Sequence, residues 1–323
     1  MWPGLLLAVL IAAPSAWLGS TALKLIGGPV IAIILGILIN NVVKVPASAR
    51  PGIAFCSKKI LQGAIIVLGG SLSLRQVWET GRSSLTVMLL SLSAALVAAF
   101  VIGRLLKVSS NLISLVGVGT GICGGSAIAA VAPIIKADDD EIAFSISTVF
   151  MFNVIAVLIF PLIGHALAMN DNSFGLWSGT AINDTSSVVA ASYSFSKEAG
   201  DIATVTKLAR TTMIVPISLA FALLVSRRRG QGSYSLRKVF PWFVLGFLVA
   251  SVVNTLGILG PHFPPLAGEA GKLMIVLALA GVGLGADLRK MIQIGPRPIL
   301  MGLLVWVVVA LSSLGAQSLT GQL

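Results

Sequence analysis

The chain has 323 residues, of which 56% are hydrophobic and only 10% carry charge, where a soluble domain has about 25% charged residues. A soluble core of this length could not bury so much apolar surface, so the composition excludes a soluble domain and predicts an all-α polytopic membrane protein. The net charge of +11 comes from Lys and Arg between apolar runs, which indicates topology signals and lipid headgroups rather than nucleic-acid binding.

About eleven apolar segments follow one another, and several are shorter than the roughly 20 residues that span a bilayer. The first could pass for a signal-peptide core, but it lacks a basic start and is interpreted as a short first span. Short or interrupted spans are typical of transporters rather than of simple anchors. The segments cover residues 4–19, 28–43, 60–73, 84–103, 112–135, 142–163, 175–195, 204–226, 239–257, 271–286 and 298–318.

An internal repeat links the two ends of the chain. The predicted second to fourth spans resemble the ninth to eleventh, a shift of seven spans, and an odd shift inverts the second copy across the membrane. Lys58 and Lys272, one of the matched pairs, are interpreted as anchors at the membrane boundary. The matched positions are Lys58 with Lys272, Gly69 with Gly283, Leu74-Arg75 with Leu288-Arg289, and Ile34–Leu38 with Val244–Leu248.

Two polar, glycine-rich breaks interrupt the apolar segments 112–135 and 175–195. They cover residues 119–127 and 179–187, and both open with Gly-Thr. Inside lipid every backbone N–H and C=O must be satisfied, so a broken helix at membrane depth must be buried or line a cavity. Paired broken helices indicate a transporter binding site near the midplane. The alternative is that both breaks are ordinary loops between spans.

A helix that begins inside the membrane presents free N–H groups and a partial positive charge, which favour an anion. Hydroxyl side chains add donors, and glycine lets the backbone approach the ligand. The alternative role of these small residues is helix capping and close helix packing. The candidate ligands are Thr120, Gly124, Gly125 and Ser126 in the first break and Asn183, Thr185, Ser186 and Ser187 in the second.

Three charged residues lie where the chain is otherwise membrane-embedded. Asp184 is costly there and is a candidate for carrying a coupling proton or cation; its alternative role is the N-cap of the following helix. Lys207 and Arg210 share one helix face because they lie three residues apart. They could form a positive wall for an anion, pair with Asp184, or reach to the interface by snorkelling.

Other polar residues have structural interpretations. Asn153 is expected to hydrogen-bond between helices, Pro216 to kink its helix, and the acidic run 138–141 to complement a helix N-terminus in solvent. No phosphate-binding loop for ATP is present, and no metal site, cofactor or enzyme activity is predicted. The residues that could have suggested one, but form no ligand spacing and no nucleophile–base pair, are Cys56, Cys123, Ser126, His165 and His262.

The sequence GTGICGGSAIAA at Gly119–Ala130, the sequence SGTAINDTSSVVAAS at Ser178–Ser192 and the segment Lys207–Arg210 resemble the bacterial YeiH family, also called UPF0324. Members of this family are described as sulfate exporter family transporters of the inner membrane. The resemblance covers nearly the whole chain. It implies an inverted-repeat transporter with crossed broken helices that forms a homodimer.

We therefore expect one transporter domain over residues 1–323, with scaffold spans 28–103 and 239–318 around a core 112–226. The expected function is secondary transport of a small anion, sulfate or a related sulfur oxyanion first, by alternating access. The alternative is a Na⁺- or H⁺-coupled cation carrier that uses Asp184. The basic cluster 227–238 is expected in the cytoplasm, which places the N-terminus inside and the C-terminus outside.

Overall fold

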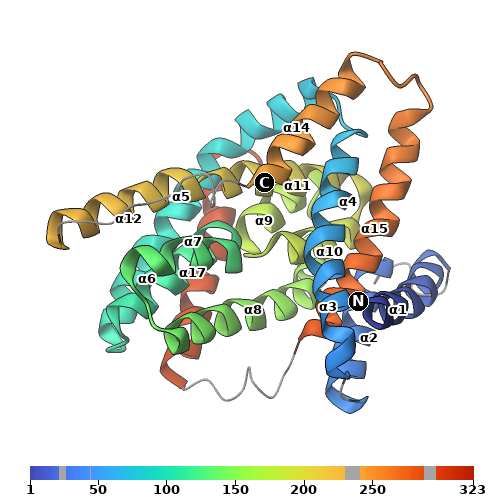
Figure 1. The fold of residues 1–323 in the computed structure, drawn as a ribbon. Helices are drawn as coiled ribbons and strands as arrows, with labels where there is room; N and C mark the ends of the chain where they lie inside the picture. Colours follow the sequence, from blue (N-terminus) through green and yellow to red (C-terminus); the bar gives the residue numbers. More distant parts are fainter. Residues whose placement is uncertain (22–26, 44, 230–240, 287–295) are drawn as a thin grey trace.

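The computed structural model describes residues 1–21, 27–43, 45–229, 241–286 and 296–323, and over these ranges it is helical without a strand (Figure 1). Several residues used to predict the topology and the repeat lie outside these ranges. They are Lys24, Lys44, Arg237, Lys238, Leu288, Arg289 and Lys290.

Each predicted apolar segment contains helix. Seven of the described helices are long and apolar enough to cross a membrane, and the other apolar helices are shorter, so the protein is a multi-pass membrane protein. The number of eleven crossings stays a prediction. The elements are α1 Trp2–Ser20, α2 Gly27–Val43, η1 Ala47–Ala49, α3 Arg50–Phe55, η2 Cys56–Ile60, α4 Leu61–Gly69, α5 Leu74–Leu105, α6 Ser110–Val118, η3 Gly119–Cys123, α7 Gly125–Ile135, α8 Asp139–Ala166, α9 Asp171–Ala181, α10 Thr185–Phe195, α11 Lys197–Thr212, α12 Ile214–Arg229, α14 Trp242–Thr255, α15 Phe263–Gly285 and α17 Pro296–Thr320.

Local sequence explains where several helices begin. Ser73 and Asp138 each form a capping box at the start of α5 and α8, in which a side chain satisfies one of the free N–H groups of the first turn. The acidic run therefore does complement a helix N-terminus. Pro216 lies in the first turn of α12, just after α11 ends at Thr212, so the chain is interrupted before this proline rather than kinked at it.

The helices form two packed bodies, which we call the panel and the core. The panel consists of α1–α4, α14 and α15, and the core consists of α5–α12 and α17. Ala95 of α5 and Val309 of α17 share one buried cluster with residues of α8 to α11. α5 and α17 match in the repeat but pack against the broken helices, so we group them with the core; the predicted division into scaffold spans and a core of residues 112–226 stays a prediction.

Close glycine contacts repeat between the matched helices of the panel. A Cβ on Gly283 of α15 would lie 3.0 Å from the Cα of Gly36 on α2, and a Cβ on Gly69 of α4 would lie 2.3 Å from the carbonyl oxygen of Phe247 on α14. The α2–α15 contact thus recurs between α14 and α4, their repeat-matched partners. The matched helices α4 and α15 run in opposite directions in Figure 1, as an inverted repeat predicts.

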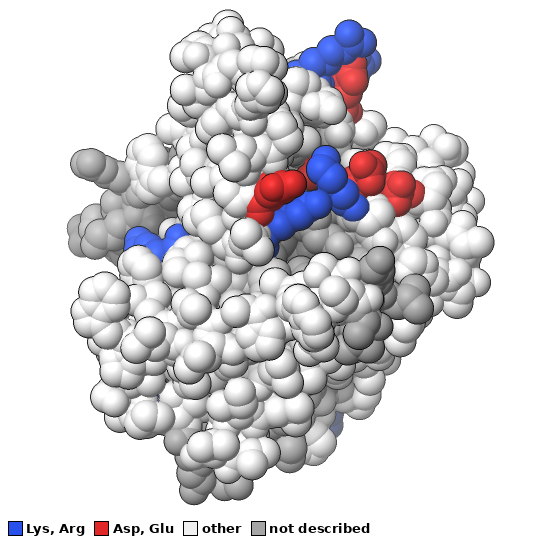
Figure 2. All heavy atoms as spheres, turned by 90° about the vertical axis from the view of Figure 1, so that its right-hand side faces the viewer, with Lys and Arg blue, Asp and Glu red and all other residues white. Residues whose placement is uncertain are grey.

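The surface is largely uncharged. Figure 2 shows Lys, Arg, Asp and Glu gathered in a few places on this face, with broad uncharged areas between them. Large apolar side chains such as Leu105, Leu162 and Leu319 are exposed, which suits contact with lipid but not with water.

Candidate functional site

The two breaks meet inside the core. The first lies between η3 and α7 and the second between α9 and α10, at the residues predicted from the sequence. A Cβ built on Gly124 would lie 3.4 Å from the Cβ of Asp184. These two residues are the N-caps of α7 and α10, so the first turns of two half-helices begin beside each other.

The first break depends on glycine. The π-helical turn η3 ends at Gly124, whose φ of 70° and ψ of −131° suit glycine but not a residue with a side chain. The N–H of Gly124 donates to the carbonyl of Gly119 over 2.8 Å. Since Gly124 has no side chain, it cannot cap α7, and the N-terminus of α7 keeps its partial positive charge.

The second break is held by polar side chains. Asn153 of α8 accepts hydrogen bonds from the N–H groups of Asn183 and Asp184, both over 3.1 Å. The Asp184 carboxylate accepts from the Ser186 N–H over 2.9 Å and from the Ser186 hydroxyl. Asp184 is therefore the N-cap of α10, and Asn153 binds between helices as expected.

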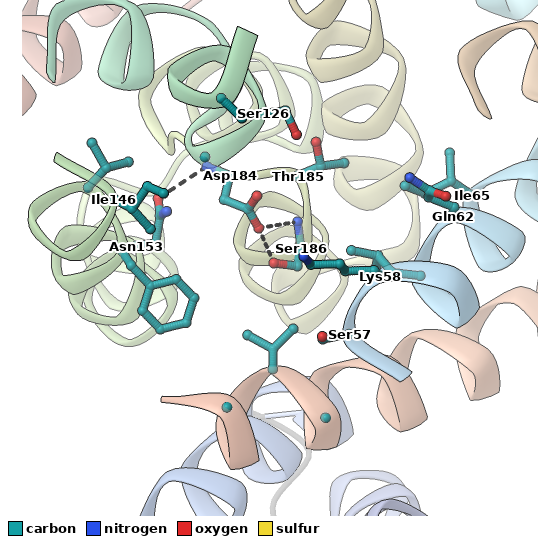
Figure 3. A pocket seen from close by; sticks show the side chains of 18 of the residues that line it. Ser57, Lys58, Gln62, Ile65, Ser126, Ile146, Asn153, Asp184, Thr185 and Ser186 are labelled. Carbon is teal, nitrogen blue, oxygen red and sulfur yellow. Dashed lines mark hydrogen bonds between the residues drawn. The ribbon is translucent and has the colours of Figure 1, made fainter. Parts of the chain in front are cut away.

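An open cavity of about 560 Å³ lies between core and panel, next to both half-helix N-termini. Figure 3 shows Asp184 and Ser186 at its centre, Ser126 and Thr185 beside them, and Lys58 and Gln62 reaching in from η2 and α4. The panel also contributes Ser57, Phe243 and Gly281, and α8 contributes Asn153.

Five of the predicted site residues line this cavity: Gly125, Ser126, Asp184, Thr185 and Ser186. The remaining candidates lie behind this surface. Thr120, Asn183 and Ser187 are buried, each no more than 2% exposed, and Gly124 is the turn itself. The side-chain amide of Asn183, unlike its backbone N–H, has no hydrogen-bond partner among the described residues.

Sequence reasoning missed Lys58 as a site residue and interpreted it as a boundary anchor. The structure instead places Lys58 in a π-helical turn within the long helix Ala47–Gly69, and from there it extends into the cavity. A π-helical turn is frequent at functional sites, but its position is not visible in the sequence. The available signal was a charged pair inside a segment that otherwise suits the membrane.

Lys207 and Arg210 share a helix face as predicted, but they do not line the cavity. Both are completely buried. Lys207 Nζ donates to the carbonyl oxygens of Ile122, at 2.9 Å, and Ile182, at 2.8 Å. Arg210 Nε donates to the carbonyl oxygen of Gly121 at 2.5 Å. The predicted wall of positive charge thus points at the carbonyl ends of the broken helices, which carry partial negative charge.

A second cavity of about 250 Å³ lies within the core, between the start of α5 and α11. It is lined by Gln76 and Thr80 and by Lys197, Glu198 and Asp201. An apolar cluster that includes Leu61, Ile65, Leu72, Val205 and Leu208 lies between the two cavities. Leu61 and Ile65 face the larger cavity, and Leu72 and Val205 face the smaller one.

Within the described ranges, no three His, Cys, Asp or Glu side chains come together as a metal site. Cys56 and Cys123 are both buried and unbridged. The expectation that the protein binds no metal or cofactor stays a prediction.

Comparison with known proteins gives a consistent family assignment. The family model described as "Conserved hypothetical protein 698" matches residues 3–302. Proteins named UPF0324 membrane protein are similar to the chain over nearly their whole length. The identity is 41% with one from Streptococcus agalactiae (99% of this chain and 97% of that protein), 42% with one from Streptococcus mutans (98% and 97%) and 38% with one from Fusobacterium nucleatum (98% and 98%). The chain therefore belongs to the UPF0324 family of membrane proteins.

Proposed function

We propose that the protein is a secondary transporter of a small inorganic or sulfur-containing anion, with sulfate as the first substrate to test. The observation that carries this proposal is the cavity between core and panel, which both half-helix N-termini and Lys58 face. Helix N-termini bind anions through free N–H groups and the helix dipole. The hydroxyl groups of Ser126 and Thr185 add hydrogen-bond donors.

The charges around the site favour an anion. Lys58 lines the cavity, and Lys207 and Arg210 are buried behind it, whereas Asp184 is the one carboxylate among the described lining residues. Three cationic groups thus lie near one anionic group, and this excess of positive charge attracts an anion.

The two cavities support alternating access. The larger lies between core and panel and the smaller between α5 and α11 of the core, and the apolar cluster of Leu61, Ile65, Leu72, Val205 and Leu208 contributes to the lining of both. Contacts of this kind are not directional, so they can be exchanged for similar contacts as the core shifts against the panel. In the proposed cycle, the larger cavity closes as the smaller one opens.

The proposal includes the setting of the protein. It is placed in the bacterial inner membrane as a homodimer, with the N-terminus in the cytoplasm and the C-terminus outside, and it acts as a carrier rather than an enzyme. The orientation rests on the basic cluster 227–238, and the dimer rests on the family resemblance. Cysteine labelling from each side of the membrane tests the orientation, and cross-linking in membranes tests the dimer.

The decisive experiment measures binding and transport with matched lysine variants. Purified protein is screened for thermal stabilisation by sulfate, sulfite, thiosulfate, taurine and chloride, and uptake of the stabilising anion is followed in proteoliposomes. Lys58→Gln should weaken anion binding roughly tenfold or more, because a hydrogen bond to a charged group contributes about 1.5–3 kcal/mol. Lys59→Gln is the control, since Lys59 is exposed but does not line the cavity. Equal effects of both variants would contradict the proposed site.

A cation-coupled carrier is the second candidate, and the position of Asp184 in the cavity favours it. An acid in a broken helix can take up a proton or bind Na⁺. This function predicts stabilisation that follows Na⁺ or pH without any anion and disappears in Asp184→Asn. Stabilisation by an anion that persists in Asp184→Asn would reject it.

A further inference from the structure

One side chain connects the two breaks. The Lys207 ammonium donates to the carbonyl of Ile122 in η3 and to the carbonyl of Ile182 at the end of α9. It is completely buried. Arg210, one turn further along α11, donates to the neighbouring carbonyl of Gly121. The place where the two broken helices end is thus occupied by cationic side chains of the chain itself.

The backbone at this place favours a cation. The last carbonyls of a helix have no partner within the helix and carry partial negative charge. Here two helix ends meet where no water is available to satisfy their carbonyls. In transporters with broken helices, carbonyls at half-helix C-termini coordinate the coupling Na⁺ or H⁺. In this protein an ammonium group bonds to such carbonyls from both breaks.

We propose that Lys207 is a tethered cation that takes the place of a coupling metal ion between the breaks, so that the carrier works without Na⁺. This inference rests on the proposed transporter function, and it specifies the coupling of that function. Lys207 is a positioning residue: it holds Ile122 and Ile182 together and thereby keeps the N-termini of α7 and α10 facing the cavity. Arg210 neutralises the adjacent carbonyl of η3 in the same way.

The proposal predicts a cation response of the Lys207 variants that an ordinary buried lysine would not give. If the ammonium stands in for a metal ion, its removal exposes two carbonyls that a free cation can bind. Lys207→Ala should then have a lower Tm, and Na⁺ or methylammonium should restore most of that loss. Lys207→Met fills the same space without charge, so neither cation should restore its Tm. If Lys207 only filled space, Na⁺ and methylammonium would change the Tm of Lys207→Ala and Lys207→Met by the same amount.

The experiment uses the full chain purified in detergent. Tm is measured in NaCl, KCl and methylammonium chloride against choline chloride at equal ionic strength. The wild-type Tm should not differ between NaCl and choline chloride. Lys59→Ala is the control, because Lys59 is exposed and lines neither cavity. Its response should match the wild type in every salt.

Two results would overturn the proposal: a wild-type protein that Na⁺ stabilises, or a Lys207→Ala protein that no cation stabilises beyond the wild type. If Lys207→Ala does not fold, Lys207→Ser replaces it, since its short side chain likewise leaves the two carbonyls open to a free cation. The anion-carrier function fails by a different result. In that case no anion raises the Tm or is transported in any salt, while the cation response of the Lys207 variants still reports on the tethered cation.

Discussion

The two breaks stabilise the start of the following half-helix with different chemistry. The second break is stabilised by side chains: Asp184 caps α10, and Asn153 binds the N–H groups of Asn183 and Asp184. The first break uses a left-handed glycine, Gly124, and leaves α7 without a side-chain cap from its N-cap residue. The C-terminal ends of the two helices that precede the breaks, in contrast, share Lys207.

This difference indicates which break offers more to a ligand. A capped N-terminus has used part of its hydrogen-bonding capacity, and the Asp184 carboxylate offsets the dipole of α10. The N-terminus of α7, with exposed Ser126 in its first turn, retains its capacity. For the proposed anion carrier, the comparison therefore predicts anion recognition mainly at the first break and positioning at the second.

The largest effect is expected at Arg210. Arg210→Ala removes the donor to Gly121 and leaves a cavity and an unpaired carbonyl in η3, which should cost about 3 kcal/mol of stability. The loss is measured as a lower Tm in detergent. Arg104→Ala is the matched control, because Arg104 is exposed at the end of α5 and should change stability by less than about 0.5 kcal/mol. A similar shift in both variants would refute the role given to Arg210.

The second largest effect on stability is expected at Gly124. Gly124→Ala forces a side chain into a conformation with φ of 70° and should lose about 1–3 kcal/mol of stability. Gly125→Ala provides the comparison, since a Cβ there meets no atom within 4 Å and the residue has no positive φ. Its Tm should stay close to that of the wild type. If the two alanine variants have the same Tm, the first break does not depend on glycine geometry.

Two substitutions of Asp184 distinguish its contribution as an N-cap from that of its negative charge. Asp184→Ala should lose about 1 kcal/mol, the usual contribution of an N-cap, whereas Asn is as good an N-cap as Asp. Asp184→Asn should therefore keep the wild-type Tm. Thermal unfolding of both variants, with and without Na⁺, measures the difference. A Tm for Asp184→Asn as low as that of Asp184→Ala would show that the negative charge, and not the cap, stabilises the second break.

The smallest effect concerns ligand affinity rather than stability. Ser126→Ala removes one hydroxyl donor at the first break and should raise the Kd for the anion roughly fivefold, since one hydrogen bond contributes about 1 kcal/mol. Ser187→Ala, at a buried hydroxyl of the second break that does not line the cavity, should leave the Kd unchanged. Anion titrations followed by thermal shift measure both. A greater loss in Ser187→Ala would reverse the assignment of roles to the two breaks.

Much of the fold follows from the sequence because apolar length and interrupted periodicity depend on local composition. The helices, both breaks and the repeat-matched positions Gly69 and Gly283 were predicted in this way. The partners of Lys207 and Arg210 were not, because they are backbone carbonyls, and any residue supplies a carbonyl. The position of Lys58 in the cavity could not be predicted either, since it lies in a π-helical turn and such a turn cannot be recognised from amino-acid composition.

The bridge made by Lys207 has a mechanical consequence. If one broken helix slid along the other, an ammonium–carbonyl bond would break where no solvent could replace it, so the two crossed helices are locked into a single rigid unit. The apolar contacts of Leu61 and Ile65 with the core offer no such resistance, because they can be exchanged for similar contacts as the surfaces slide. In the proposed transport cycle, any movement must then carry both breaks, and the proposed ligand between them, together across the face of the panel.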